Sequence, residues 1–224
     1  MSTSPYTPSE FFDLSQFAHA SLFEECNYPW EALIHLSTYV KINTSGKIEI
    51  DIPQGVFLVN PESISIGPGT VIEPGAYIQG PCIIGARCII RHGAYLRGDV
   101  LLGDDCIIGH ATEIKHSILL DGAAAPHFNY IGDSILGGNV NLGAGVVCAN
   151  LRLDHAIVKV DCNGKKIETG MKKLGAIIGD GAQVGCNCVL NPGTLLGKSS
   201  LCSPCLNISG FVKPHSKVKP FYKA

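Results

Sequence analysis

The sequence predicts an all-β fold, a parallel β-helix in which short strands wind into a solenoid. An aliphatic residue recurs at every sixth position over a long uninterrupted stretch, and a mostly small residue follows it four positions later. The composition, with 26 glycines and only 16% charged residues, is rich in turn-forming residues and poor in solvated helix faces. The uninterrupted aliphatic positions are Ile66, Ile72, Ile78, Ile84, Ile90, Leu96, Leu102, Ile108 and Ile114.

The period of six excludes a helix as the repeating unit. Six residues advance an α-helix by about 600°, which leaves successive aliphatic residues about 240° apart around its axis. If three hexapeptides make one turn, every sixth residue points to the axis, and successive coils stack about 4.8 Å apart. An antiparallel sandwich would instead alternate with period two. The signature returns at Leu136, Leu142 and Cys148, and again at Ile178, Val184, Leu190, Leu196, Cys202 and Ile208.

Two segments interrupt the repeat, and interruptions of a solenoid are where functional groups usually project. The 22 residues from Ile114 to Leu136 fit two shortened faces of five residues, with Leu119, Ala125 and Ile131 pointing inward. The second interruption, a projecting loop at about 149–175, separates Cys148 from Ile178 by a multiple of six, so we expect the chain to rejoin the coil in register. Its lysines favour an exposed loop: Lys159, Lys165, Lys166, Lys172 and Lys173.

The N-terminal segment reads as helical. Thr7, Pro8 and Glu10 occupy N-cap, N1 and N3 positions of a helix start, and residues 29–40 read as a second helix. Because a solenoid needs its open hydrophobic end covered, we expect residues 1–50 to form a helical cap, with an oligomer contact as the alternative role of helices 8–41, and residues 51–224 to form the β-helix domain.

Charge and hydropathy restrict the partners. A formal net charge of -2 offers no basic field for nucleic acid. The sequence contains no run of 18 apolar residues, as a membrane-spanning helix would need. Its N-terminus also lacks the basic and then apolar regions of a secretory signal, so we expect a cytoplasmic protein. Several of the ten cysteines fall at the small inward position and are expected to be reduced core thiols: Cys82, Cys88, Cys106 and Cys188.

Two cations mark a candidate phosphate site. Arg97 and Lys115 each follow an inward residue by one and lie 18 residues apart, which stacks them on one face in adjacent coils. Because stacked cations repel unless an anion bridges them, a phosphate ester is a natural guest. The alternative is a pair of solvated cations neutralised by Glu113 or Asp99.

His127 lies in the irregular coil beyond these cations. Its imidazole is suited to remove a proton from an amine or hydroxyl nucleophile. We expect the shortened faces to move His127 out of the regular lattice so that it reaches a groove. His92 and His110 occupy the same turn position in preceding coils, and three stacked imidazoles could instead bind a metal.

Residues 93–152 resemble a known enzyme domain. The segments "YLRGDVLLG", "GHATEIKHS" and "HFNYIGDSILGGNVNLGAGVVCAN", with "KKLGAIIGDGAQVG" further on, are similar to the acetyltransferase domain of the bifunctional N-acetylglucosamine-1-phosphate uridyltransferase/glucosamine-1-phosphate acetyltransferase family. That domain belongs to the hexapeptide-repeat acyltransferases, so the resemblance implies a left-handed β-helix. The long excursion looks more like the C-terminal β-helix of archaeal-type sugar-phosphate nucleotidyltransferases.

The resemblance implies an acetyl-CoA-dependent N-acetyltransferase acting on glucosamine 1-phosphate or a similar amino-sugar phosphate, as a homotrimer with sites between subunits and without a bound metal. No nucleotidyltransferase motif occurs, so we expect the uridyl-transfer half to be missing. In this comparison His127 stands at the general base. Residues at sugar-phosphate positions are Arg97, Lys115, Tyr130, Asn141 and Lys172 or its neighbour Lys173. Residues at coenzyme positions are Ala144, Asn150, Cys186 and Pro204.

Departures from the family keep two other interpretations open. Cys186 and Pro204 replace a serine and an alanine, and Leu151 replaces a tyrosine, all on the coenzyme side. A non-catalytic sugar-phosphate-binding or scaffold homologue would tolerate these changes. "LRGDV" and "GHATEIKH" also resemble segments of γ-class carbonic anhydrases, which would use His110 and His116 as zinc ligands.

Overall fold

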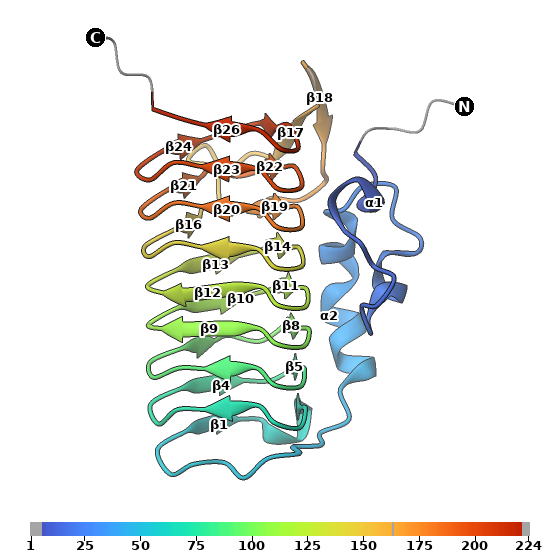
Figure 1. Ribbon diagram of the computed structural model, residues 1–224. Coiled ribbons are helices and arrows are strands. Elements are labelled where there is room, and N and C mark those ends of the chain that lie inside the picture. The colour runs from blue at the N-terminus through green and yellow to red at the C-terminus, as the bar shows by residue number, and fades with distance from the viewer. Residues whose placement is uncertain (1–5, 163, 221–224) are drawn as a thin grey trace.

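A left-handed parallel β-helix forms most of the computed structural model, which describes residues 6–162 and 164–220 (Figure 1). Three parallel sheets of eight strands each make the faces of a triangular coil. The first face contains β1 (Phe57–Val59), β4 (Tyr77–Gln79), β7 (Tyr95–Leu96), β10 (Glu113–Lys115), β13 (Tyr130–Gly132), β16 (Val147–Cys148), β21 (Val189–Leu190) and β24 (Asn207–Ile208).

The other two faces follow in the same order along the chain. The second face contains β2 (Ile64–Ile66), β5 (Cys82–Ile84), β8 (Val100–Leu102), β11 (Ser117–Leu119), β14 (Ile135–Leu136), β19 (Ala176–Ile178), β22 (Thr194–Leu196) and β25 (Phe211–Val212). The third face contains β3 (Val71–Ile72), β6 (Ile89–Ile90), β9 (Ile107–His110), β12 (Ala124–His127), β15 (Asn141–Leu142), β20 (Gln183–Val184), β23 (Leu201–Cys202) and β26 (Lys217–Val218).

The inward positions follow the sequence repeat. Ile72, Ile90 and Ile108 are successive register partners and are buried, which confirms the 18-residue coil. In the irregular coil, Ile108 pairs with Ala125 and Ile114 with Ile131, so each of these steps is one residue shorter. The predicted inward residues of that coil all belong to the hydrophobic core: Leu119, Ala125, Ile131 and Leu136.

The expectation that His127 leaves the lattice is wrong. His127 ends β12 and is the register partner of His110, so its backbone stays in the ladder of the third face. The shortened stretches run from Ile114 to Leu119 and from Ile131 to Leu136, between the first and second faces. The irregular coil is therefore shortened at the corner between the first and second faces, whereas His127 lies at the corner between the third and first faces.

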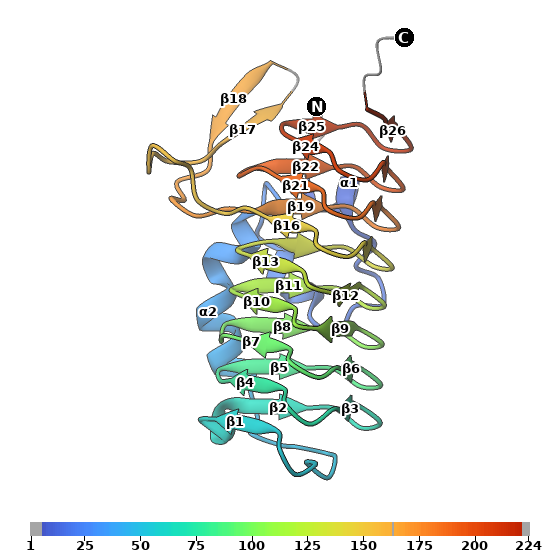
Figure 2. The same cartoon turned by 90° about the vertical axis from the view of Figure 1, so that its left-hand side faces the viewer.

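The N-terminal helices lie along the side of the β-helix. Helix α1 (Pro8–Phe11) begins at the predicted N-cap Thr7 but lasts one turn, and it is followed by the 3₁₀ turn η1 (Ala20–Phe23) and by α2 (Glu31–Asn43). Figures 1 and 2 show these elements against one flank of the coil, where they cover the second face. Their buried side chains share one apolar cluster with outward residues of that face, including Leu101 and Ile118.

This flank position differs from an end cap, because the outer surface of the second face is itself apolar. The division at residue 50 stays a prediction, although a parallel bridge between Ile48 and Ile66 already ties the segment before it to the first coil. A second 3₁₀ turn, η2 (Pro61–Ser63), links the first face to the second in that coil.

The projecting loop contains an antiparallel hairpin, β17 (Lys159–Cys162) and β18 (Lys165–Glu168), that the repeat did not predict. The chain leaves the first face after β16 and re-enters the second face at β19, where Ile178 pairs with Leu136. The predicted return in register is thus confirmed. Val160 and Cys162 of the hairpin pack into the same apolar cluster as the N-terminal helices. The five loop lysines are exposed, as expected.

All ten cysteines are free thiols, and the four predicted core thiols are buried. Within the described residues, none of the helices has the length and apolar character that crossing a membrane requires.

Candidate functional site

The two predicted cations stack on the first face. Strands β7 and β10 pair Tyr95 with Glu113 and Leu96 with Ile114, and the N–H of Arg97 donates to the carbonyl of Ile114 at 2.9 Å. Arg97 and Lys115 therefore lie in one column, one coil apart, at the end of each strand. The register thus supports the geometry that the sequence spacing predicted.

Both cations have carboxylate partners. Arg97 Nη1 donates to Glu113 Oε1 at 2.6 Å, and Lys115 Nζ lies 3.4 Å from Asp133 Oδ2. Asp133 is buried and also accepts a hydrogen bond from the side-chain amide of Asn150. No role was assigned to Asp133 from the sequence, although this residue lies in the segment HFNYIGDS that carries the family resemblance. The arrangement holds the cations in place and leaves their remaining N–H groups available to a ligand.

Tyr130 completes this cluster on β13. Burial raises the pKa of Tyr130, and the nearby carboxylates of Glu113 and Asp133 raise it further, so the phenol stays protonated and can donate a hydrogen bond. A side chain at Gly132 would place its Cβ 2.8 Å from Tyr130 Oη and 2.6 Å from Asn150 Nδ2. The absence of that side chain lets the phenol and the amide approach each other beside Lys115. We call Arg97, Lys115, Tyr130, Asp133 and Asn150 the cation cluster.

His127 belongs to a second group, at the turn between the third and first faces. Successive turns are joined by N–H to carbonyl bonds of 2.8–3.0 Å, from Phe128 to His110, from Gly145 to His127, from Asn187 to Ala144 and from Cys205 to Cys186. These bonds align equivalent positions in one column along the coil axis. We call it the corner column: His92, His110, His127, Ala144, Cys186 and Pro204.

Three of the four coenzyme positions therefore share a column with His127. Ala144 lies on the next coil after His127, and Cys186 and Pro204 follow on the next two. Asn150 differs, because its side chain joins the cation cluster. Sequence spacing could not show this alignment, since the projecting loop intervenes between Ala144 and Cys186.

The cation cluster and the corner column lie at opposite edges of the first face. His127 precedes β13 at the edge next to the third face, whereas Lys115 ends β10 at the edge next to the second face. Asn141 is exposed on β15 of the third face, paired with Ala124 and Gln183. A single chain thus brings Arg97, Lys115 and Tyr130 together but does not bring His127 or Asn141 to them.

The base of the projecting loop adds a cavity to the first face. Lys173 forms an antiparallel bridge with Leu151, and Lys172 is exposed beside it. The cavity has a volume of about 470 Å³ and begins at Ala149, which follows Gly132 in the column of Arg97 and Lys115. Its lining is formed by Ala149, Leu151, Arg152, Leu153, Asp154, Asn191 and Pro192.

The histidines do not assemble into a metal site. The rings of His92 and His110 stack with centroids 5.6 Å apart, and the ring of Phe128 packs on His110 at 5.0 Å. His116 turns toward α2, where its Nε2 lies 3.0 Å from the carbonyl oxygen of Leu33. In the described part of the chain, no group of three or more His, Cys, Asp or Glu side chains is placed to hold a metal ion.

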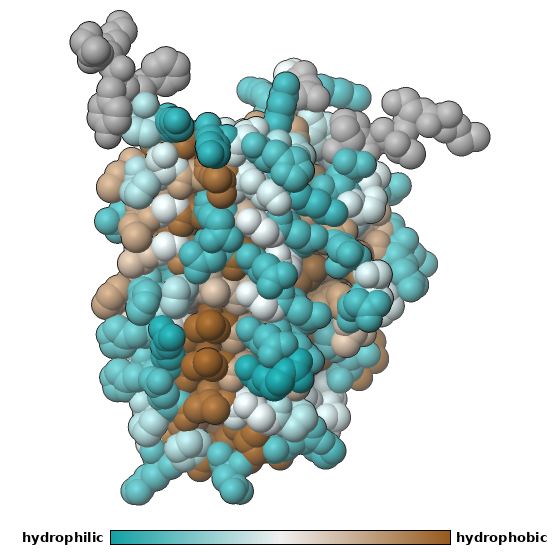
Figure 3. Space-filling view, viewed as in Figure 1, coloured by the Kyte–Doolittle hydropathy of each residue, from teal (hydrophilic) through white to brown (hydrophobic). Residues whose placement is uncertain are grey.

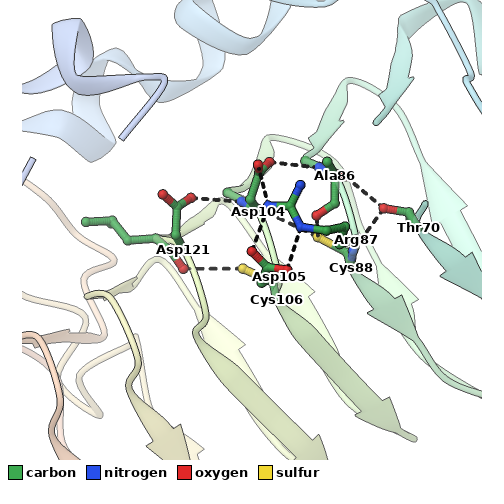
Figure 4. A network of polar contacts seen from close by, with 11 residues as sticks. Thr70, Ala86, Arg87, Cys88, Asp104, Asp105, Cys106 and Asp121 are labelled. Atoms are coloured by element: carbon green, nitrogen blue, oxygen red, sulfur yellow. Dashed lines mark hydrogen bonds and ion pairs between the residues drawn. The ribbon is translucent and has the colours of Figure 1, made fainter. Parts of the chain in front are cut away.

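The remaining corner, between the second and third faces, carries acidic residues that sequence reasoning did not single out (Figure 4). Asp104 Oδ1 accepts the N–H of Ala86 at 2.8 Å, and Asp121 Oδ1 accepts the N–H of Asp104 at 2.8 Å. Arg87 pairs with Asp104 and Asp105. These contacts join successive coils, so this corner has a structural role, and a recurring Asp after the second-face strand is its sequence signal.

Taken together, fold and sequence define the class: this is a hexapeptide-repeat left-handed β-helix protein. Among solved structures, UDP-N-acetylglucosamine acyltransferase from Campylobacter jejuni shares this fold with a TM-score of 0.52 and 16% identity, over 75% of this chain and 69% of that one. The GMPPB C-terminal domain family matches residues 78–169.

More specifically, a segment of this chain is similar in sequence to part of the bifunctional sugar-1-phosphate nucleotidylyltransferase/acetyltransferases. The protein of that name from Sulfurisphaera tokodaii is 44% identical over 79 residues, which cover 35% of this chain and 20% of the relative. The bifunctional protein GlmU of Methanococcus maripaludis is 42% identical over 83 residues, 37% of this chain and 20% of the relative. The matched segment thus spans about a fifth of the length of these relatives.

Proposed function

We propose that this protein is a coenzyme A-dependent acyltransferase that acetylates the amine of glucosamine 1-phosphate or a similar amino-sugar phosphate, in nucleotide-sugar biosynthesis. The observation that carries the proposal is the alignment of His127 with Ala144, Cys186 and Pro204 in the corner column. The similar protein from Sulfurisphaera tokodaii is named a bifunctional sugar-1-phosphate nucleotidylyltransferase/acetyltransferase, which supports acetyl transfer as the reaction class.

The cation cluster would bind the phosphate. Arg97 and Lys115 present guanidinium and ammonium donors one coil apart, and Tyr130 adds a protonated phenol. Lys172 or Lys173 would approach from the base of the projecting loop. Charge-assisted hydrogen bonds of this kind are roughly twice as strong as neutral ones, so the phosphate would fix the position of the sugar.

The corner column would hold the acyl donor and perform the chemistry. As the amine attacks the thioester carbonyl carbon, a C–N bond forms, the C–S bond breaks, and His127 accepts the amine proton. A backbone N–H near Ala144 would stabilise the oxyanion, and the coenzyme leaves as its thiol after protonation. Asn141 would orient the sugar ring.

A second copy of the chain would complete the site, because one chain keeps the two groups at opposite edges of the first face. We propose a cyclic homotrimer in which His127 and Asn141 of one subunit approach the cation cluster of the next. An apolar column on the N-terminal half of the third face (Figure 3) supports such packing. Its members are aligned by strand register: Val71, Ile89, Ile107 and Ala124.

The test is to incubate the protein with glucosamine 1-phosphate and acetyl-coenzyme A and to follow thiol release. General-base catalysis contributes about 10²- to 10⁴-fold, so His127→Ala should lose a comparable factor in kcat/KM. His92→Ala is the matched control, because it removes an imidazole from the same column two coils away. Wild-type activity no higher than that of His127→Ala would overturn the proposal.

The second candidate is a sugar-phosphate-binding protein without catalysis. It is favoured by Leu151, which stands where the family has a coenzyme-side tyrosine. Calorimetric binding of glucosamine 1-phosphate that Lys115→Met abolishes, with no thiol release, would support this candidate. The zinc enzyme is not proposed, because His110 and His116 point to different parts of the structure.

A further inference from the structure

Two exposed thiols lie next to each other at the C-terminal end of the corner column. Of the ten cysteines, seven are buried and Cys26 is half-buried, whereas Cys186 and Cys205 are exposed. Cys186 is a member of the column, and Cys205 follows Pro204 on the next coil. The N–H of Cys205 donates to the carbonyl oxygen of Cys186 at 2.8 Å.

This hydrogen bond fixes the separation of the two residues. Bond lengths on either side of it limit the distance between the two Cα atoms to about 6.7 Å at most. Disulfides join Cα atoms that lie about 4.4–6.8 Å apart. The Cα separation of Cys186 and Cys205 therefore meets the distance requirement of a disulfide.

An equivalent pair in the same fold indicates the direction of the two side chains. Phe128 donates its N–H to His110 at 2.8 Å, just as Cys205 does to Cys186, and their ring centroids lie 5.0 Å apart. Phe128 and Cys205 both have a positive φ, 53° and 59°. From this equivalence we expect the side chain of Cys205 to leave the backbone toward Cys186, as that of Phe128 does toward His110.

The neighbouring thiol of Cys188 is less able to react than the two exposed thiols. Cys188 is buried, and its Sγ donates to the carbonyl oxygen of Ser203 at 3.1 Å. Burial raises the pKa of the Cys188 thiol, and charge on Cys205 or Cys186 would raise it further. Because the thiolate is the nucleophile in disulfide exchange, Cys188 is a poor participant.

We propose that Cys186 and Cys205 are a dithiol modification site that low-molecular-weight disulfides, such as glutathione disulfide, convert to an intramolecular disulfide. One protein thiolate attacks a sulfur of the small disulfide, which forms a mixed disulfide and releases one small thiol. The second protein thiolate then displaces the other small thiol. Two protein thiols are oxidised and one small disulfide is reduced to two thiols. The site does not depend on the proposed acyl transfer.

The test uses the reduced, full-length protein and glutathione disulfide. Aromatic-disulfide titration of the native protein should count two fast-reacting thiols before oxidation and none afterwards, with both restored by dithiothreitol. After alkylation and trypsin cleavage at Lys173, Lys198 and Lys217, residues 174–198 and 199–217 should be linked and carry no glutathione.

Single variants locate the bond. Cys186→Ser and Cys205→Ser should each lose the cross-link and retain one glutathione on the remaining exposed cysteine. Cys188→Ser and Cys202→Ser, the matched buried controls on the same two peptides, should keep the cross-link. Wild-type protein that retains a glutathione on each exposed cysteine, a link that disappears in Cys188→Ser, or covalent dimers on non-reducing gels would overturn the proposal.

Discussion

Lys115→Met should destabilise the fold far more than Arg97→Met, although the two cations occupy the same column. The Lys115 and Asp133 side chains are 23% and 7% exposed, whereas those of Arg97 and Glu113 are 41% and 33% exposed. Removing one partner of a fully buried ion pair costs about 3–5 kcal/mol, whereas an exposed pair contributes about 0–1 kcal/mol.

Because Asn150 still donates to Asp133 in the variant, we expect Lys115→Met to lower the free energy of unfolding by about 2–3 kcal/mol, below the fully buried value. Arg97→Met should cost less than about 1 kcal/mol. Methionine keeps most of the apolar stem in both variants, so the difference reports the charge and its hydrogen bonds.

Urea unfolding followed by circular dichroism measures both values. For a chain of this size each kcal/mol shifts Tm by about 2–4 °C, so Lys115→Met should melt about 4–12 °C below wild type. The double variant Lys115→Met/Asp133→Asn should recover part of the loss, because a neutral amide needs no counter-charge. Equal losses in the two single variants would refute the burial argument.

Three further predictions concern the scaffold. Gly109→Ala should prevent normal coil stacking, because the added Cβ would lie 1.5 Å from the carbonyl oxygen of Pro126 in the next coil. The control Gly138→Ala should fold, because its added Cβ meets nothing closer than 3.5 Å. Expression level and circular dichroism distinguish the two variants. Ile118→Ala, in the apolar cluster beneath the N-terminal helices, should cost about 2–5 kcal/mol in urea unfolding, and a loss below 1 kcal/mol would contradict that packing. His116, whose Nδ1 lies 3.7 Å from Asp99 Oδ2, is the largest cause that lowers the pKa of Asp99, and the Ser37 side chain lowers it further. The stabilisation from Asp99 is therefore present above its ordinary pKa and is lost as pH falls. Ser37→Ala should raise the acid-unfolding midpoint, and an unchanged midpoint would refute this contribution.

The interior of the coil was predictable because a solenoid repeats the same environment at a fixed sequence interval. Each inward residue contacts its counterparts one coil away, so selection for an aliphatic side chain appears directly as the six-residue period. The same regularity predicted that Arg97 and Lys115 would stack. It also predicted the return of the chain at Ile178 after the projecting loop.

Other features depend on contacts that this period does not encode. The side-on helices could have been anticipated from Leu101 and Ile118, each directly before an inward residue, since such aliphatic pairs indicate a sheet buried on both sides. The Asn-Gly dipeptide at 163–164 is a hairpin signal. The distance between His127 and the two cations was not predictable. The sequence spacing shows in which coil each residue lies, but it does not give the width of the face that separates them.

Because the chain re-enters the coil in register after the projecting loop, the strand pairing of the β-helix does not depend on the length of that loop. Leu136 and Ile178 pair across the insertion as if it were absent, so residues added at its exposed turns would not shift the coils on either side. Doubling the length of a flexible loop adds only about 0.6 kcal/mol of closure entropy. Insertions can therefore remodel the rim of the cavity at Ala149, as long as Val160 and Cys162 keep their places in the apolar cluster.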